Sequence, residues 1–366
     1  MSSESFDTVV IGGGQAGLAI GYYLKRQYRR FVILEAGPRV GEAWRGRWDS
    51  LRLFTPAKYN GLPGLPFPGA DFYFPTKDEV AEYLERYAQR FELPVRLNAK
   101  VDALTRRDGR YQLTAGPKRL SAARVVVATG AFRRPRLPAY ASELDPALVQ
   151  LHSSAYRNPT QLPPGSVLVV GAGNSGAEIA LEAKASGRRV WLAGRGTGRI
   201  PADVLGRLFG GSLYWWMISR LLSEETPIGR KVKAKSLHHG SPLIRLKPRD
   251  ITRAGVERVP RLAGVKGGRP LLEDGQVLPV DAVVWATGFQ PEFDWISLPV
   301  LDESGYPRHE RGAALDAPGL YLLGLHFQHA LTSALLGGVG ADAAYIARRI
   351  QAEPTTVEVP AAAGVA

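Results

Sequence analysis

The sequence lacks cysteine altogether: none of its 366 residues is one. This absence excludes disulfide bonds, thiolate metal sites and the Cys-x-x-Cys pair on which thiol-disulfide reductases depend. Histidine is also scarce, with six scattered residues, and none forms a helical His/Glu pair suited to a metal ion. We therefore predict no metal site and no chemistry based on the chain's own thiols.

Long apolar runs are missing as well. A membrane-spanning helix needs roughly 20 consecutive apolar residues, whereas the most apolar segment, residues 213–222, is short and contains Arg220. The first predicted strand begins at Phe6, which leaves no room for a secretory signal ahead of it. We expect a cytoplasmic globular protein without a membrane span.

Acidic residues are outnumbered by basic ones, which gives a net charge of +13. One interpretation is an ordinary basic surface, and another is the attraction of phosphorylated cofactors, which are anionic. Nucleic-acid binding is a weaker interpretation, because the positive charge is spread out and no nucleic-acid module is recognisable. We expect a small-molecule substrate and no nucleic-acid partner.

What is present is a glycine-rich motif between an apolar run and a predicted helix. Residues 6–11 are apolar except for Asp7 and Thr8, and Gly12-Gly13-Gly14-Gln15-Ala16-Gly17 follows. In this motif Gly12 permits a tight turn, Gly14 admits a pyrophosphate and Gly17 allows close packing of helix and strand. The helix N-terminus supplies amides and partial positive charge to phosphates. Glu35, at the end of the next strand, can accept hydrogen bonds from ribose hydroxyls, which suits FAD.

A second motif of the same form, Gly171-Ala172-Gly173-Asn174-Ser175-Gly176, follows the apolar residues 167–170. Gly171, Gly173 and Gly176 repeat the three glycines, and Asn174 and Ser175 begin the predicted helix. At the end of the next strand stands Arg195 in place of an acid. A guanidinium can hold a 2′-phosphate with two hydrogen bonds. This motif therefore predicts a preference for NADPH, with NADH as an alternative.

The two motifs predict an α/β protein with two Rossmann-like dinucleotide-binding domains. Each half also reaches an Ala-Thr-Gly turn, at residues 128–130 and 286–288. The NADPH domain is therefore expected to be inserted into the FAD domain. We place the FAD domain at residues 1–157 and 286–366 and the NADPH domain at 158–285.

Further residues are candidate cofactor contacts because of where they stand relative to the predicted strands and helices. Trp44 and Arg45 come after the first strand–helix–strand unit, and Leu336 precedes a helix predicted over residues 340–350. That helix N-terminus can stabilise the negative charge of a reduced flavin. The two Ala-Thr-Gly turns contribute Thr129, Gly130, Thr287 and Gly288, and Gly324 closes a strand predicted over residues 319–325.

Segment 196–250 is basic and contains Trp215 and Trp216. A helix is predicted here over residues 202–222, and three roles stay open for it: a substrate lid, ordinary packing, or docking on a membrane surface. A second helix is predicted after Thr76, because Thr76 and Glu79 form a capping box ahead of residues at helical spacing.

With these residues the chain resembles the flavin-containing monooxygenase branch of the two-dinucleotide flavoproteins, in its small bacterial form. The resemblance runs from Val9 to about Ile350 and is most specific over residues 11–17, 41–48, 171–178, 286–289 and 318–340. It implies FAD, NADPH and O₂ as reactants, with a C4a-hydroperoxyflavin that oxygenates a small sulfur or nitrogen nucleophile or a ketone. It also implies a homodimer.

The resemblance has departures. His152, Tyr156 and Arg157 match a His-x-x-x-Tyr-Arg pattern of the family and make His152 and Tyr156 candidate catalytic residues, but Pro146 and Leu148 stand where Phe and Gly are usual. An asparagine that protects the oxygenated flavin in relatives has no match in the stretch Phe54-Thr55-Pro56, although Asn60 is near.

These departures leave two alternatives to a monooxygenase. One is an FAD-dependent NAD(P)H reductase or oxidase that passes electrons to a protein, a quinone or O₂. The other is a regulatory flavoprotein in which NADPH binding is the signal.

Overall fold

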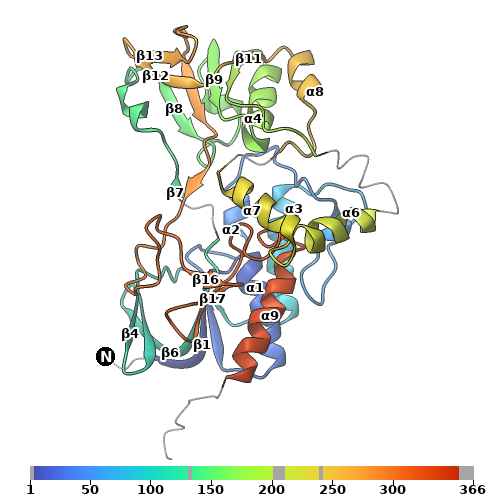
Figure 1. Ribbon diagram of the computed structural model, residues 1–366, viewed down its shortest axis with the longest axis vertical. Coiled ribbons are helices and arrows are strands. Elements are labelled where there is room, and N and C mark those ends of the chain that lie inside the picture. The colour runs from blue at the N-terminus through green and yellow to red at the C-terminus, as the bar shows by residue number, and fades with distance from the viewer. Residues whose placement is uncertain (1–3, 131–133, 201–210, 239–241, 354–366) are drawn as a thin grey trace, which may run out of the picture.

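The computed structural model describes residues 4–130, 134–200, 211–238 and 242–353. Two α/β units are stacked along the long axis of the molecule (Figure 1). The α/β architecture with parallel sheets, expected from the two glycine motifs, is confirmed.

The first unit is built on a nine-stranded sheet of order β16-β17-β18-β6-β1-β2-β3, with β4 and β5 added beside β6. The central strands β18, β6, β1, β2 and β3 are parallel. Such a sheet is buried on both faces, and β2 is buried along its whole length. The strands are β1 Glu4–Ile11, β2 Phe31–Leu34, β3 Val95–Arg96, β4 Ala103–Arg107, β5 Arg110–Ala115, β6 Lys118–Val127, β16 His309–Glu310, β17 Ala313–Ala314 and β18 Leu320–Leu322.

Three long helices cover this sheet, with α1 and α9 side by side (Figure 1). The capping box predicted for α3 is confirmed: Glu79 N donates to Thr76 Oγ1 at 3.3 Å, and Thr76 N donates to Glu79 Oε2 at 2.8 Å. The helix predicted from residue 340 is also present and begins one residue earlier. The helices of the unit are α1 Gln15–Arg26, α2 Glu42–Arg45, α3 Lys77–Arg90 and α9 Val339–Ala352, with a 3₁₀ turn η1 Ala57–Tyr59.

The second unit carries a five-stranded, fully parallel sheet of order β11-β10-β9-β14-β8. Helix α4 packs on β9 and β10, and a hairpin of β12 and β13 packs on the opposite face of the sheet. The elements are β8 Val149–His152, β9 Ser166–Val170, α4 Asn174–Ala185, β10 Arg189–Ala193, α8 Pro248–Arg253, β11 Glu257–Val259, β12 Leu262–Lys266, β13 Arg269–Leu272 and β14 Ala282–Trp285, with 3₁₀ turns η2 Ala139–Glu143 and η3 Pro159–Gln161.

Two of the places where the chain passes between the units pair with each other. Strand β7, Arg134–Pro135, runs antiparallel to β15, Phe289–Gln290, between the two sheets (Figure 1). The domain boundary expected at 157/158 is corrected by this arrangement, because β8 is already hydrogen-bonded to β14 in the second sheet. The proline-rich residues 158–164 connect β8 to β9 inside one unit and are not the passage between units.

The segment over residues 196–250 leaves the second unit and pairs with the first. Glu224 N donates to His329 O at 2.8 Å, and Leu331 N donates to Leu222 O at 3.0 Å. Part of the helix expected over 202–222 lies outside the described residues; the described part is α6 Ser212–Trp216 and a π-helical turn η5 Met217–Leu221, followed by α7 Pro227–His238. None of the described helices has the length and apolarity required to cross a bilayer.

Candidate cofactor sites and their junction

The first glycine motif forms a tight strand-to-helix loop in which each glycine meets a different constraint. Gly12 has a φ of +109°, and a Cβ there would lie 2.5 Å from the carbonyl oxygen of Ala128. A Cβ on Gly17 would lie 1.8 Å from the Gly12 carbonyl oxygen, whereas one on Gly14 would meet nothing within 4 Å. Two glycines therefore close the loop, and Gly14 leaves an open side at the start of α1, where a phosphate can approach.

Glu35 braces this loop from the end of β2. Its Oε2 accepts from Gly13 N at 2.7 Å, and its Oε1 accepts from Gly37 N at 2.7 Å. A carboxylate oxygen has two lone pairs, so both oxygens keep capacity for a ribose hydroxyl. Glu35 is thus held at the position predicted for it, with its charge on the loop that would hold FAD.

The N-terminus of α1 is tied to two other segments through Gln15. Trp44 Nε1 donates to Gln15 Oε1 at 3.0 Å, and Gln15 Nε2 donates to Ala334 O at 3.2 Å. In the described structure α1 has no side-chain cap, so its first amides stay available for a phosphate. Ala16 is buried against Gly324, where a Cβ would lie 3.0 Å from Ala16 Cβ.

Arg45, expected near the flavin, turns away from this loop. Its guanidinium donates to Val40 O at 2.7 Å and to Glu85 Oε2 of α3 at 2.8 Å. The side chain therefore fixes α2 on α3, and the available contact from this position to a cofactor is its backbone.

The segment before α9 is tightly packed. A Cβ on Gly337 would lie 1.6 Å from the carbonyl oxygen of Tyr59, and one on Gly338 would lie 2.0 Å from that of Thr332. Leu336 is buried beside them. The ring of Trp215 stacks on Tyr59 with centroids 4.9 Å apart and planes 9° apart, so α6 covers this segment.

Asn60, in the same region, is fully buried and bound to Thr55. Thr55 Oγ1 donates to Asn60 Oδ1 at 2.6 Å, and Asn60 Nδ2 donates to Thr55 O at 2.9 Å. Its amide therefore holds the loop of residues 55–60 in shape.

The second glycine motif repeats the geometry of the first. Gly171 has a φ of +110°, and a Cβ there would lie 2.2 Å from Ala286 O; one on Gly176 would lie 1.8 Å from Gly171 O. Gly173 has φ −76° and ψ −171°, against −79° and −170° for Gly14. In both units the Ala-Thr-Gly turn presses on the first glycine, which places Thr129, Gly130, Thr287 and Gly288 beside the two loops.

The surroundings of the second motif differ from those of the first. Asn174 Nδ2 donates to Pro242 O at 2.9 Å and its Oδ1 accepts from Ile244 N at 3.1 Å, so residues 242–244 lie against the start of α4, where Ser175 also sits. Arg245 Nη2 reaches Glu178 Oε1 at 3.0 Å. Arg195 follows β10, is exposed, and has no side-chain partner among the described residues.

The two candidate catalytic residues lie in different environments. Tyr156 is fully buried in the core of the second unit, and its hydroxyl donates to Glu182 Oε2 at 3.0 Å. Burial and the Glu182 charge raise its pKa. This is a packing position beside Trp48, with the hydroxyl already bound to Glu182, and a catalytic role for Tyr156 stays a prediction.

His152 lies at the junction of the two units, next to the turn that leads into β15. Both its ring nitrogens form hydrogen bonds. Ser154 N donates to Nδ1 at 3.1 Å, so Nε2 carries the hydrogen and donates to Gly288 O at 2.9 Å. Burial lowers the pKa of His152 below 6.5, and the Arg47 charge lowers it further, against the effect of the Gly288 bond. A neutral imidazole tied at both nitrogens holds the crossing together and is poorly placed to shuttle protons.

The sequence did not single out Arg47 and Trp48, which follow α2 at this junction. Trp48 belongs to the first unit in sequence but is buried in the core of the second, with Tyr156 and Leu162. Arg47 lies over the ring of Phe289, with its Cζ 5.7 Å from the centroid. No spacing rule marks these residues, because their partners come from a separate unit.

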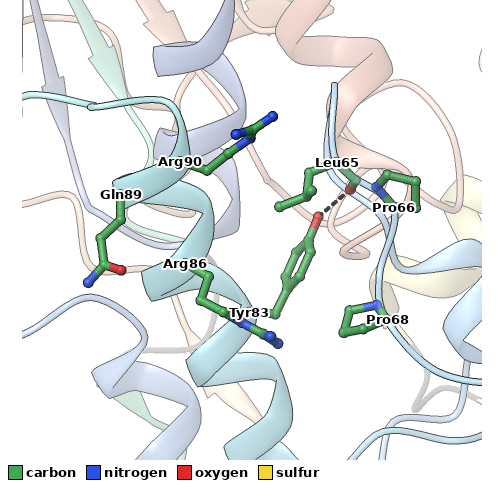
Figure 2. Close-up of a pocket in the computed structure, with 7 residues that line it drawn as sticks. All are labelled: Leu65, Pro66, Pro68, Tyr83, Arg86, Gln89 and Arg90. Carbon is green, nitrogen blue, oxygen red and sulfur yellow. Dashed lines mark hydrogen bonds between the residues drawn. The ribbon is translucent and has the colours of Figure 1, made fainter.

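One surface hollow lies apart from all these residues (Figure 2). It has a volume of about 530 Å³ between α3 and the loop of residues 62–68. Tyr83 OH donates to Leu65 O at 2.7 Å and holds the loop on the helix. None of the expected cofactor residues lines it; the lining is Leu65, Pro66, Pro68, Tyr83, Arg86, Gln89 and Arg90.

Comparison with known proteins agrees with this geometry. The sequence profile of the pyridine nucleotide-disulphide oxidoreductase family matches residues 9–207. The chain belongs to this family. Because it has no cysteine, this oxidoreductase carries the family's two nucleotide-binding folds without a dithiol of its own.

Relatives of this oxidoreductase span nearly its whole length. An uncharacterized CzcO-like oxidoreductase of Geobacillus kaustophilus is 42% identical over 93% of the chain and 97% of the relative. The probable indole-3-pyruvate monooxygenase YUCCA7 of Arabidopsis thaliana is 29% identical over 93% and 86%. A flavin-containing monooxygenase from Stenotrophomonas maltophilia has a solved structure with a TM-score of 0.77 and 29% identity, covering 95% of this chain and 99% of that one. This oxidoreductase is therefore flavin monooxygenase-like, with two dinucleotide-binding domains.

Proposed function

We propose that this oxidoreductase is an FAD-dependent monooxygenase that uses NADPH and O₂ to oxygenate a small sulfur or nitrogen nucleophile or a ketone. The observation that carries the proposal is the pair of matching glycine loops, one braced by Glu35 and the other followed by Arg195. The similarity to two monooxygenases over most of the chain supports the oxygenation step. One of them is named for a 2-oxo acid, indole-3-pyruvate, which supports keeping ketones among the substrates.

The residues of the first unit fit FAD. The open side of Gly14 and the uncapped N-terminus of α1 would take the diphosphate, and Glu35 would accept from the ribose. The N-terminus of α9 would face the flavin ring. The residues that would line the path between that loop and α9 are Gln15, Trp44, Thr129, Gly130, Gly324 and Leu336. When bound, the flavin accepts hydride from the nicotinamide and activates O₂.

The residues of the second unit fit NADPH. Gly171, Gly173 and Gly176 would admit its diphosphate, with Asn174 and Ser175 in the first turn of α4. Arg195 would bind the 2′-phosphate, and Thr287 and Gly288 would lie beside the nicotinamide half. Trp48 and the paired crossings β7 and β15 would hold the two units, and hence the two cofactors, in register.

The deciding experiment follows the fate of oxygen in the purified yellow protein. With methyl phenyl sulfide as the probe, each NADPH consumed is expected to give one sulfoxide and little hydrogen peroxide. Peroxide without sulfoxide, repeated with amine and ketone probes, would replace the proposal with a reductase or oxidase. Bound cofactors without turnover would instead support a regulatory flavoprotein.

A further inference from the structure

An arginine pair at the junction between the two units is not accounted for by either cofactor. Arg47 and Arg157 come from different units, yet Arg157 Nη2 lies 3.8 Å from where a Cβ on Gly46 would stand, next to Arg47 in the chain. Arg157 uses Nη1 for the carbonyl oxygens of Ser154 and Tyr156, at 3.0 and 3.2 Å. The guanidinium of Arg157 is therefore held against the chain next to Arg47, at the junction of the two units, and its charge acts on Arg47.

Arg47 is also short of partners. Its side chain is half-buried and lies against the face of Phe289, and within the described ranges no carboxylate pairs with it and no acceptor binds it. Burial and the charge of Arg157 both lower the pKa of Arg47, which means that the cation is held there at a cost in free energy. A bound anion relieves such a cost by supplying the missing opposite charge.

The position of Arg47 is fixed from both sides. Trp48, the next residue, is anchored in the core of the second unit, and Asp49 N donates to Arg157 O at 2.7 Å. On the other side Arg47 N donates to Trp44 O at 3.0 Å, and Trp44 in turn binds Gln15 at the first glycine loop. Phe289, beneath the guanidinium, follows the turn that presses on Gly171 of the second loop. Arg47 thus lies on a short path between the two loops, where cofactor and substrate would meet.

The charges of the two cofactors are already matched elsewhere. The N-termini of α1 and α4 suit the two diphosphates, and Arg195 suits the 2′-phosphate. Arg47 is then left for a third anion. We propose that Arg47, assisted by Arg157, binds a carboxylate of the substrate, so that the molecule oxidised at the junction is an organic acid. The oxidation of the acid rests on the proposed function, whereas the binding of its carboxylate at Arg47 does not.

The geometry suits a carboxylate. An arginine presents a planar fork that can donate two parallel hydrogen bonds to the two oxygens of a carboxylate. The face of Phe289 holds that plane in one orientation, and the neighbouring ring of His152, at 5.1 Å and 82° to Phe289, closes the apolar side. A neutral ligand of the same shape would leave the charge of Arg47 without a counter-charge.

The test compares a matched pair of sulfides, 4-(methylthio)benzoate and its methyl ester, on the FAD-loaded protein. Binding is followed by the change in the absorption spectrum of the oxidised flavin, which requires no turnover. The wild type is expected to bind the acid at least ~10-fold more tightly than the ester, the size expected of a charge-assisted pair. In Arg47→Met this preference should vanish with ester binding unchanged, and in Arg47→Lys it should be intermediate.

Two controls distinguish a carboxylate site at Arg47 from a general effect of positive charge and from a role of Arg47 in NADPH binding. Arg39→Met removes an exposed arginine that pairs with Glu42 of α2, the short helix just before Arg47, and should behave as the wild type. The NADPH concentration that half-saturates anaerobic flavin reduction should be the same in Arg47→Met and wild type. Weakened NADPH binding in Arg47→Met with an unchanged acid preference would assign the site to a cofactor phosphate and overturn the proposal. A wild type that does not prefer the acid, or binds neither probe, would overturn it as well.

Failure of the proposed function has a different signature. If no sulfoxide forms but the acid preference depends on Arg47, the monooxygenase assignment falls and the carboxylate site stands. If sulfoxide forms equally well from acid and ester in all variants, the monooxygenase assignment stands and the carboxylate site falls.

Discussion

The Nε2 atom of His152 lies 2.9 Å from the carbonyl oxygen of Gly288 and donates its hydrogen to it. This bond joins the end of β8 to the turn that leads the chain out of β14 and back to the first unit. Because Ser154 N donates to Nδ1, the ring must stay neutral to keep both bonds. The neutral histidine therefore joins the two segments where the chain passes between the units.

The first prediction concerns how the contribution of His152 to folding stability depends on pH. The folded-state pKa of His152 is below its ordinary value of 6.5, so on acidification the unfolded chain takes up its proton first. Its contribution to stability is therefore present above about pH 6.5 and declines as the pH falls below that value toward the folded pKa. His152→Gln can keep a donor to Gly288 but cannot titrate. Its melting temperature should fall less between pH 7.5 and 5.5 than that of the wild type.

His152→Ala supplies the control for the hydrogen bond itself. It leaves the carbonyl oxygen of Gly288 with one donor fewer, and should lower the free energy of unfolding at pH 7.5 by about 1–3 kcal/mol, more than His152→Gln. Other buried histidines titrate in both proteins, so only the difference in pH slope counts. Equal slopes in wild type and His152→Gln would contradict the assignment.

The second prediction separates two glycines of one motif. A Cβ at position 17 would lie 1.8 Å from the Gly12 carbonyl oxygen, so Gly17→Ala should cost about 3 kcal/mol or more in stability. At Gly14 the space is open, so Gly14→Ala should lower the stability of the flavin-free protein by only about 1 kcal/mol or less, the cost of an alanine at a helix N-cap. Its methyl group would nevertheless stand where a diphosphate must approach, and the flavin bound per chain should fall at least ~10-fold. A fully yellow Gly14→Ala protein would show that the diphosphate lies elsewhere.

How well the sequence predicts a feature of this structure depends on how far apart in the chain the interacting residues are. The glycine loops, Glu35 and the capping box of Thr76 and Glu79 depend on residues close in sequence or on a repeated strand–helix unit, and they lie where the pattern places them. The crossing at β7 and β15 depends on pairing of remote residues. The proline-rich residues 158–164 therefore gave a misleading boundary.

The junction residues show the same limit. Trp48 and Arg47 look in the sequence like an ordinary continuation of Trp44 and Arg45. Only the docking of the second unit gives Trp48 its core and places Arg47 on Phe289. Conversely, Tyr156 matched a family pattern, yet its hydroxyl is consumed by Glu182 within the core. Contacts between the two units leave no periodic pattern in the sequence of either unit.

The third prediction compares adjacent tryptophans of α6. Trp215 stacks on Tyr59 beside Gly337, whereas Trp216 is 56% exposed. An aromatic stack of this kind contributes about 0.5–1.5 kcal/mol, so Trp215→Ala should loosen α6 over the segment before α9 and raise the KM for the oxygenated substrate several-fold. The rate of flavin reduction by NADPH should be unchanged. Trp216→Ala is the matched control, and an equal effect of both substitutions would count against α6 as a cover of the site.

The fourth prediction concerns the choice between NADPH and NADH. Arg195 follows β10, one residue beyond the position where the first unit has Glu35, and its exposed guanidinium has no partner in the described parts of the chain. Removal of a charge-assisted pair to a 2′-phosphate costs about 1.5–3 kcal/mol. Arg195→Ala should therefore reduce the ratio of kcat/KM for NADPH to that for NADH by ~10- to 150-fold, entirely through weaker use of NADPH. Arg195→Lys should lie between, because an ammonium keeps the charge but not the fork.

The control for Arg195 is Arg107→Ala, which removes an exposed arginine from the β4–β5 hairpin of the first unit and lowers the net charge equally. If the two alanine variants reduce NADPH use alike, the effect is general attraction by a basic surface, with no specific contact. Measurement at two salt concentrations sharpens the distinction, because a specific pair persists at 0.5 M salt, where the screening length is only ~4 Å. A selectivity that survives Arg195→Ala at both concentrations would place the 2′-phosphate on another residue of the second unit.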